Sequence, residues 1–286
     1  MNRITGPFDE ASESVSLDDA LPRDIETLFD KISHLTIADT ETDQGLREVI
    51  AAFKEFLTKQ ECWNALVNFE ELLKEKGKET ENQFRNNKRT PNVLHEIRNC
   101  MQSLSMIIEG AYDMEAYQEA GGIDTDMVAG LRHDSIEDKG QFKSTLINLM
   151  ERNLQRLFQN SQIDYHTYMA KLIEAGQGAE AVDRLSAKEA KINPKTGKII
   201  WKDKKKLKPE KEKRFNGDAN KYFYHLRENI FSLLRKYADR NENISTRLGN
   251  SGFTLSQDRK YVRKTLETFY LENFRDKAIE MHPGFE

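Results

Sequence analysis

The chain has 286 residues and a formal net charge of −4; 37% of its residues are hydrophobic and 32% are charged. Two cysteines cannot form a disulfide framework, which excludes a disulfide-rich secreted protein. The sequence shows no apolar leader and no run of about 18 apolar residues, so we expect a cytoplasmic protein without a membrane partner. With only 15 Gly and 6 Pro, the composition favours a predominantly helical fold.

The charge is unevenly distributed along the chain. Residues 184–214 contain 13 Lys or Arg and 4 Asp or Glu, a net charge of +9, while the rest of the chain has a net charge of −13. An acidic body argues against nucleic acid as the general partner. The basic segment is either a local anion site or a solvated surface insertion, and its composition alone does not decide between these.

The N-terminal part of the chain divides into an arm and a helical segment. Residues 1–21 are polar and acidic, which is typical of a mobile arm. Apolar residues recur with a helical period through residues 22–84, so we expect an N-terminal helical extension there. Its predicted helices cover 23–34, 46–57 and 63–73.

Residues 85–286 show further helical periodicity and are expected to form a second unit. One predicted helix begins at a cap formed by Asp124 or Thr125 and leads into an acidic cluster that ends at Gly140. Within the basic segment, Asn193-Pro194 and Gly197 followed by residues 199–201 predict a β-hairpin. The other predicted helices cover 93–112, 143–160, 163–175, 218–248 and 255–279.

The acidic cluster is the part of the sequence that points to chemistry. His133 and Asp134 are followed at a spacing of four by Glu137 and Asp138, so on a helix they would form two stacked columns. Three carboxylates and an imidazole repel one another and are costly to desolvate unless a cation lies among them. The cluster therefore predicts a cation site, although these four residues alone also fit a solvated helix end.

A second polar group lies near the end of the predicted helix 218–248. Asp239, Asn243 and Thr246 are spaced at i, i+4 and i+7, so one helix face presents a carboxylate and two hydrogen-bonding groups.

The order of these residues resembles the metal-ligand order of the HD-domain phosphohydrolases, in which a helical His precedes a His-Asp pair and a distant Asp. In this chain the corresponding residues are His95, His133, Asp134 and Asp239. The closer similarity is to the hydrolase domain of the RelA/SpoT family, which removes pyrophosphate from the stringent-response alarmones guanosine tetra- and pentaphosphate (ppGpp and pppGpp). Its His-Asp-x-x-Glu-Asp motif matches residues 133–138, and its Ala-Asp-Arg-x-x-Asn-x-x-Thr motif matches residues 238–246.

The chain departs from the family pattern at several positions. Where the family has Tyr after the leading Pro and Pro after the first His, this chain has Asn92 and Glu96. Arg132 stands in place of an apolar residue, and a basic position of the family falls on Asn86. Pro91, four residues before His95, agrees with the family.

The resemblance implies an all-α, HD-domain helical bundle over residues 85–286. The short, basic, hairpin-like segment at 184–214, which the residues themselves predict, would be an insertion in this bundle. It implies a divalent metal held by His95, His133, Asp134 and Asp239, and this mixed nitrogen and oxygen ligand set favours Mn²⁺ or another first-row ion. Glu137 and Asp138 would handle the proton of a metal-activated water. The residues expected to bind the nucleotide and its several phosphates are Arg85, Lys88, Arg89, Arg240, Asn243 and Thr246.

Two alternatives stay open at this point. The same fold and metal would serve an HD phosphohydrolase that acts on another nucleotide or phosphoester. A non-catalytic HD-type module would instead use the basic segment to bind a partner. If the chain is an enzyme, the lysines of residues 188–213 could also form a lid over a polyphosphate.

Overall fold

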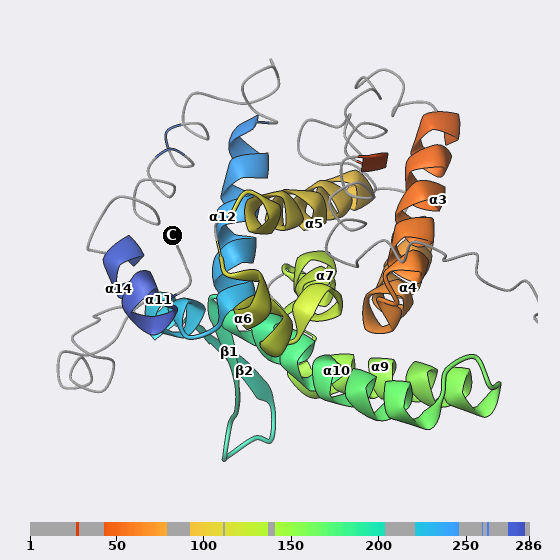
Figure 1. Ribbon diagram of the computed structural model, residues 1–286. Coiled ribbons are helices and arrows are strands. Elements are labelled where there is room, and N and C mark those ends of the chain that lie inside the picture. Colours follow the sequence, from red (N-terminus) through yellow and green to blue (C-terminus); the bar gives the residue numbers. More distant parts are fainter. Residues whose placement is uncertain are drawn as a thin grey trace, which may run out of the picture.

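The computed structural model describes residues 27–28, 43–78, 92–110, 112–136, 141–203, 221–245, 259, 262 and 274–283. Within these ranges the chain is helical apart from one β-hairpin, so the predicted all-α class is confirmed (Figure 1). None of the helices in this part of the chain is long and apolar enough to span a membrane.

The elements follow one another as α3 (Asp43–Lys59), α4 (Trp63–Lys78), α5 (Asn92–Ile108), α6 (Met114–Glu119), α7 (Gly122–Arg132), α9 (Lys143–Gln159), α10 (Tyr165–Leu185), β1 (Lys188–Ile192), β2 (Ile199–Asp203), α11 (Lys221–Arg227), α12 (Ile230–Ser245) and α14 (Phe274–Met281).

Most of the helices predicted from periodicity are present, with some changes of boundary. The predicted helix 163–175 extends to Leu185, and α6 has no counterpart among the predictions. The predicted helix 218–248 is divided at Asn229, whose side chain accepts hydrogen bonds from the backbone N–H and the hydroxyl of Ser232 and so caps α12. The arm at 1–21 and most of the predicted helices 23–34 and 255–279 lie outside the described residues.

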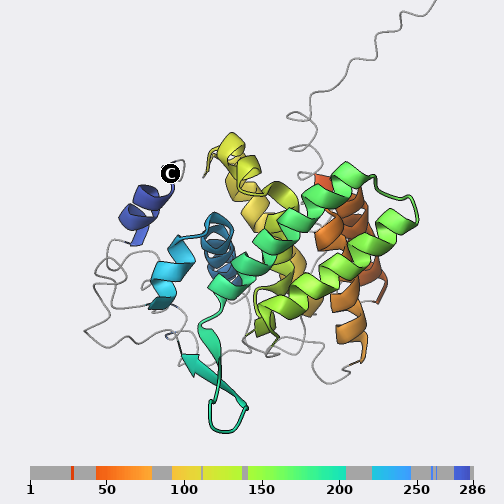
Figure 2. The same ribbon diagram turned by 90° about the horizontal axis from the view of Figure 1, so that it is seen from below.

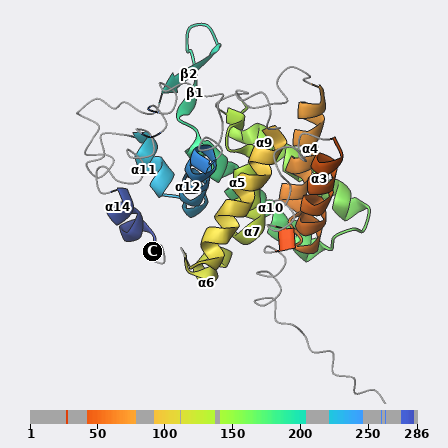
Figure 3. The same cartoon turned by 90° about the horizontal axis from the view of Figure 1, so that it is seen from above.

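Helix α7 occupies the centre of the molecule. It contacts α4, α5, α10 and α12, and every residue of it except Ile123 is buried (Figures 1 and 3). From below, α9 and α10 run side by side across the helical body (Figure 2). The buried apolar residues of α3 and α4 belong to the same hydrophobic cluster as those of α5, α7, α10 and α12.

Polar residues of α7 link it to its neighbours. Asp124, expected to cap its own helix, instead accepts hydrogen bonds from the backbone N–H groups of Asn64 (3.2 Å) and Ala65 (2.8 Å). α7 begins two residues earlier, at Gly122, so the prediction of a cap at Asp124 or Thr125 is wrong. The reason is tertiary: the first turn of α4 has unsatisfied N–H groups, and packing places them against the carboxylate of Asp124.

Arg132, the last residue of α7, explains one departure from the family pattern. Its guanidinium is buried and donates hydrogen bonds to the side-chain and backbone oxygens of Asn68 on α4, at 3.0 and 3.1 Å. It also forms an ion pair with Glu75 at 3.1 Å. A charged residue is therefore accommodated beside the His-Asp pair because α4 supplies its partners.

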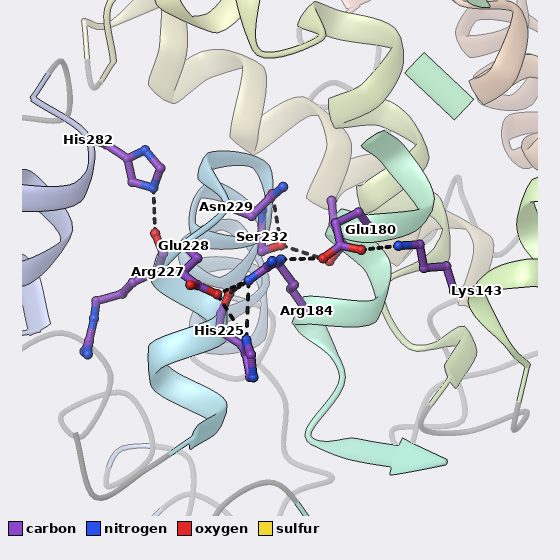
Figure 4. A network of polar contacts seen from close by, with 10 residues as sticks. Lys143, Glu180, Arg184, His225, Arg227, Glu228, Asn229, Ser232 and His282 are labelled. Carbon is purple, nitrogen blue, oxygen red and sulfur yellow. Dashed lines mark hydrogen bonds and ion pairs between the residues drawn. The ribbon is translucent and has the colours of Figure 1, made fainter. Parts of the chain in front are cut away.

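The position of α12 is fixed by polar contacts at its beginning (Figure 4). Glu180 and Arg184 of α10 form an ion pair at 2.7 Å, and Arg184 also pairs with Glu228, which follows α11. The hydroxyl of Ser232 donates to the backbone carbonyl of Ala181 at 2.9 Å. These contacts hold the first turn of α12 against α10, and the helix then extends past α7 and α5.

The hairpin pairs β1 with β2 in antiparallel register, with Ala190 opposite Trp201. The Trp201 ring stacks on Phe142, just before α9, with a centroid separation of 5.8 Å. From this root the hairpin projects away from the helical body (Figures 1 and 2). The lysine-dense residues 204–214 lie outside the described part of the chain, so the lid hypothesis stays a prediction.

Candidate metal centre

Three of the four predicted metal ligands meet where α5, α7 and α12 approach one another. His95 lies in the first turn of α5, His133 directly follows α7, and Asp239 lies in the third turn of α12. One potential ligand atom of each lies within 4.8 Å of the other two. Nε2 of His95 and Nε2 of His133 are 3.8 and 3.9 Å from the same atom, Oδ1 of Asp239.

The packing of the helices explains why residues so distant in sequence come together. Leu94 and Ile97 turn one side of α5 into the core, which buries His95 beside them. Ala238 is completely buried and carries the smallest chiral side chain, so it leaves room for the backbone of α12 beside its neighbours. The two histidines are only 5% and 6% exposed, and their ring centroids are 5.4 Å apart.

The fourth predicted ligand, Asp134, lies beside the cluster and outside it. Its Oδ2 is 3.1 Å from Nε2 of His133, but its side chain is 52% exposed and is not among the groups gathered within 4.8 Å. The angles of this contact do not make a hydrogen bond, and within the described residues Nε2 of His133 has no hydrogen-bond partner.

Both histidines point Nε2 toward Asp239 and turn Nδ1 toward other acceptors. Nδ1 of His133 is 2.8 Å from the backbone carbonyl of Gly130 and 3.0 Å from Oε2 of Glu96. Because a carbonyl oxygen can only accept, Nδ1 of His133 is the donor in that contact. Nδ1 of His95 faces Oε1 of Glu242 at 3.7 Å.

Glu96 and Glu242 were not predicted as site residues. Glu96 is visible in the sequence only as a departure from the family's Pro. Glu242 follows Asp239 by three residues, a spacing that places both on one face of α12. That spacing is the one signal that could have identified it.

The electrostatics of the cluster favour an anionic aspartate. Burial raises the pKa of Asp239, but Lys236, Arg240 and the two histidines outweigh that effect and hold the pKa well below its usual range. Lys236 Nζ lies 3.8 Å from Oδ2 of Asp239. A carboxylate that stays ionised in a buried position is well suited to bind a cation.

The electrostatics at His133 also favour positive charge. Burial lowers its pKa, yet the carboxylates of Asp134 and Glu96 raise it well above the ordinary value. Partial desolvation raises the pKa of Asp134, but the neighbouring imidazole of His133 has the larger effect, so the pKa lies below its usual value. The space around Nε2 of His133 thus attracts either a proton or a metal ion in its place.

The predicted substrate residues of α12 have different surroundings. Asn243 donates its side-chain N–H to the backbone carbonyl of Asp239 at 2.6 Å and to the Asp239 carboxylate, so here it holds a ligand in place. Arg240 is 7% exposed, and its Nε has no hydrogen-bond partner among the described residues. The other predicted catalytic and substrate residues, Glu137, Asp138, Arg85, Lys88, Arg89 and Thr246, lie outside the described part of the chain.

A second layer of polar groups lies one to two helical turns away on the same three helices. Arg235 of α12 and Asp126 of α7 form a completely buried ion pair at 2.8 Å. Asp126 also accepts hydrogen bonds from Ser103 (2.9 Å) and Tyr117 (3.0 Å), and Arg235 donates to the backbone carbonyl of Asn99 at 2.7 Å. This layer is a structural ion pair with its own partners.

The gathered side chains fit a divalent metal. Two ligands that bind one ion at about 2.0 to 2.2 Å can be at most about 4.4 Å apart, so spacings of 3.8 and 3.9 Å are within reach. Both histidines offer Nε2 to the ion, while Nδ1 faces an oxygen of the protein. Most metal-binding histidines have this arrangement. His95, His133 and Asp239 would hold the ion, with Asp134 close enough to join them.

No protein-family model, curated protein or solved structure matches this chain, so the interpretation of the cluster rests on its own residues and on the motif they form.

Proposed function

We propose that this chain is a metal-dependent phosphohydrolase of the HD type that removes pyrophosphate from guanosine tetra- or pentaphosphate. The observation that carries the proposal is the meeting of His95, His133 and Asp239 from three helices, with Nε2 of both histidines facing the aspartate. A structural ion pair on the same helices needs one Asp and one Arg, whereas this cluster offers several metal-ligand atoms.

The residues around the cluster have distinct roles in this proposal. When bound, a divalent cation supplies the charge that polarises a phosphoryl oxygen and lowers the pKa of water. Asn243 orients Asp239 through its two hydrogen bonds. Arg240 has an N–H group without a hydrogen-bond partner among the described residues, and we assign its guanidinium to phosphate, with which it would form strong bidentate hydrogen bonds.

The proton of the attacking water is assigned to the Glu-Asp part of the motif. Glu137 and Asp138 follow His133 closely in sequence, and a carboxylate within hydrogen-bond reach of a water can act as its base. The choice of a guanosine alarmone rests on the two sequence motifs, while the reaction class also draws support from the geometry of the cluster.

The test combines metal analysis with a substrate panel. Purified protein is assayed with Mn²⁺ against guanosine tetraphosphate, its adenosine analogue, GTP, a nucleoside monophosphate and a simple phosphoester. We expect Mn²⁺-dependent release of pyrophosphate from the guanosine tetraphosphate. His133→Ala should abolish both metal binding and turnover, while the control His166→Ala, at an exposed position on α10, should leave both unchanged.

Other outcomes would replace the proposal. Turnover of a different member of the panel would keep the metal chemistry and reject the alarmone. Metal binding without hydrolysis of any substrate would favour a non-catalytic module, and absence of bound metal would reject the centre itself.

A further inference from the structure

The two glutamates beside the cluster, Glu96 and Glu242, are buried carboxylates that belong to neither the predicted ligand set nor the predicted catalytic pair. They are 8% and 2% exposed. Removing a carboxylate from water costs several kcal/mol unless charged or hydrogen-bonding partners compensate. The structure places a ligand histidine next to each of them.

Each glutamate faces a ligand histidine that does not belong to its own helix. Glu96 follows His95 on α5, but its Oε2 lies 3.0 Å from Nδ1 of His133. Glu242 shares α12 with Asp239, but its Oε1 lies 3.7 Å from Nδ1 of His95. Helices α5 and α12 thus each carry one metal ligand and one glutamate, and each glutamate faces a ligand from a neighbouring helix.

We propose that Glu96 and Glu242 are positioning residues that set which ring nitrogen each histidine presents to the metal, Glu96 for His133 and Glu242 for His95. This inference rests on the proposed metal centre. A carboxylate that accepts the Nδ1 proton leaves the lone pair on Nε2, the nitrogen that faces Asp239 in both rings. It also makes the imidazole a stronger ligand, because it takes up part of the positive charge of the metal-bound ring.

Other groups also approach Glu242 and His133. Arg98 approaches Oε1 of Glu242 only to 4.0 Å, which is the outer limit of an ion pair. Nδ1 of His133 donates a hydrogen bond to the carbonyl of Gly130 at 2.8 Å in addition to facing Glu96. Because this carbonyl remains when Glu96 is replaced, Glu96→Gln measures what the carboxylate adds to the carbonyl.

The experiment measures metal affinity and ring signals separately. Zn²⁺ binding is titrated calorimetrically for the wild type, Glu96→Gln, Glu242→Gln and a control, Glu151→Gln, at an exposed position on α9. Partners that orient a ligand histidine are typically worth about 10- to 100-fold in metal affinity. We expect a loss of that order for the first two variants and none for the control, with the melting temperature in EDTA unchanged for all.

Nuclear magnetic resonance gives the readout that a general structural role would not move. In long-range ¹H–¹⁵N spectra of the Zn²⁺-loaded protein, Glu96→Gln should shift the ring nitrogens of His133 and leave those of His95 in place. Glu242→Gln should do the reverse.

The outcomes separate this inference from the proposed function. If the wild type binds no Zn²⁺, the metal centre itself is rejected. If the wild type binds Zn²⁺ and both glutamine variants bind it equally well, the centre stands and the positioning role is overturned. The role is also overturned if either variant shifts both rings together, or if its lower affinity is accompanied by an equal loss of stability in EDTA.

Discussion

The three helices α5, α7 and α12 carry two polar layers one to two turns apart, and the two layers compensate buried charge in opposite ways. In the Asp126–Arg235 layer, one carboxylate meets one guanidinium at 2.8 Å and is further bound by Ser103 and Tyr117. In the metal layer, the imidazoles stay 3.8 and 3.9 Å from Asp239, too far for hydrogen bonds. The first layer is closed by the protein, and the second leaves room for an ion.

The two aspartates show the same difference. Burial raises the pKa of Asp126 even though Arg235, Ser103 and Tyr117 oppose it, whereas surrounding positive groups outweigh burial at Asp239 and lower its pKa. Asp126 stays buried despite the cost of desolvation, and its role is structural. Asp239 stays ionised at the position where a metal ion would bind.

The largest expected effect comes from breaking the closed layer. Arg235→Met would leave Asp126 charged and buried without its cation, and removing one partner of a buried pair typically costs about 3–5 kcal/mol. Urea denaturation followed by circular dichroism should show this loss, and it should be the same with Mn²⁺ and with EDTA. A loss below about 1 kcal/mol would mean that the two layers do not differ as described.

Bound metal should stabilise the protein only through the layer that contains His95, His133 and Asp239. A ligand that binds only the folded state stabilises it by about 2.7 kcal/mol at 100 times its dissociation constant. The melting temperature of the wild type should therefore rise when Mn²⁺ is added and return when EDTA follows. His133→Ala should show no rise, while the exposed-site variant His166→Ala should respond like the wild type.

Gly130 lies between the two layers, where the helices approach one another too closely for a larger residue. A Cβ atom there would be 2.6 Å from Sγ of Cys100 and 2.7 Å from Cζ of Arg235. Gly130→Ala should destabilise by about 1–3 kcal/mol, the usual cost of overpacking. Gly176→Ala on α10 is the matched control, because a Cβ there meets no atom within 4 Å, and it should be neutral or stabilising by up to about 1 kcal/mol. Equal effects of the two substitutions in denaturation would contradict the close approach.

An intermediate case lies between the two layers in kind, because one ammonium serves two carboxylates. Lys171 Nζ lies 3.3 Å from Asp124 and 2.7 Å from Glu174. Burial, aided by the charge of Asp124 and opposed by Lys171, raises the pKa of Glu174 to about 7. The folded protein then binds this proton more tightly than the unfolded chain, so the contribution to stability is present below about pH 4.5 and is lost as the pH rises toward 7.

This pH dependence can be isolated with one variant. The stability of Glu174→Gln relative to the wild type should increase between about pH 5 and 7.5, because the amide has no proton to lose. A stability difference that is flat across this range would show that Glu174 keeps an ordinary pKa.

The sequence was informative wherever the signal is local or lies in the order of residues. Helical spacing of apolar residues predicted α3, α5 and α9 closely. The order His, His-Asp, Asp identified three side chains that meet and a fourth, Asp134, that lies beside them. Contacts across helices were not predictable in this way. Asp124 has the spacing of a cap for its own helix but serves α4, and Arg132 looked like a mismatch until Asn68 and Glu75 appeared beside it.

The same limit applies to the two glutamates of the centre. Whether a carboxylate supports a histidine depends on which ring nitrogen it faces, and that is decided by the crossing of helices that are distant in sequence. Glu96 has no local pattern that distinguishes it from an ordinary helix-surface glutamate, and Glu242 has only its three-residue spacing from Asp239. Only the packing of α5 against α12 and α7 reveals their contacts.

Helix α7 ends directly at His133, and this has an electrostatic consequence for the whole helix. The aligned peptide dipoles of an α-helix place about half a negative charge at its C-terminus, and in partly buried geometries this attracts a cation with up to about 2 kcal/mol. Because α7 is buried along nearly its whole length, water screens this field little. The backbone of the central helix, and not only its side chains, would then draw a cation to the cluster.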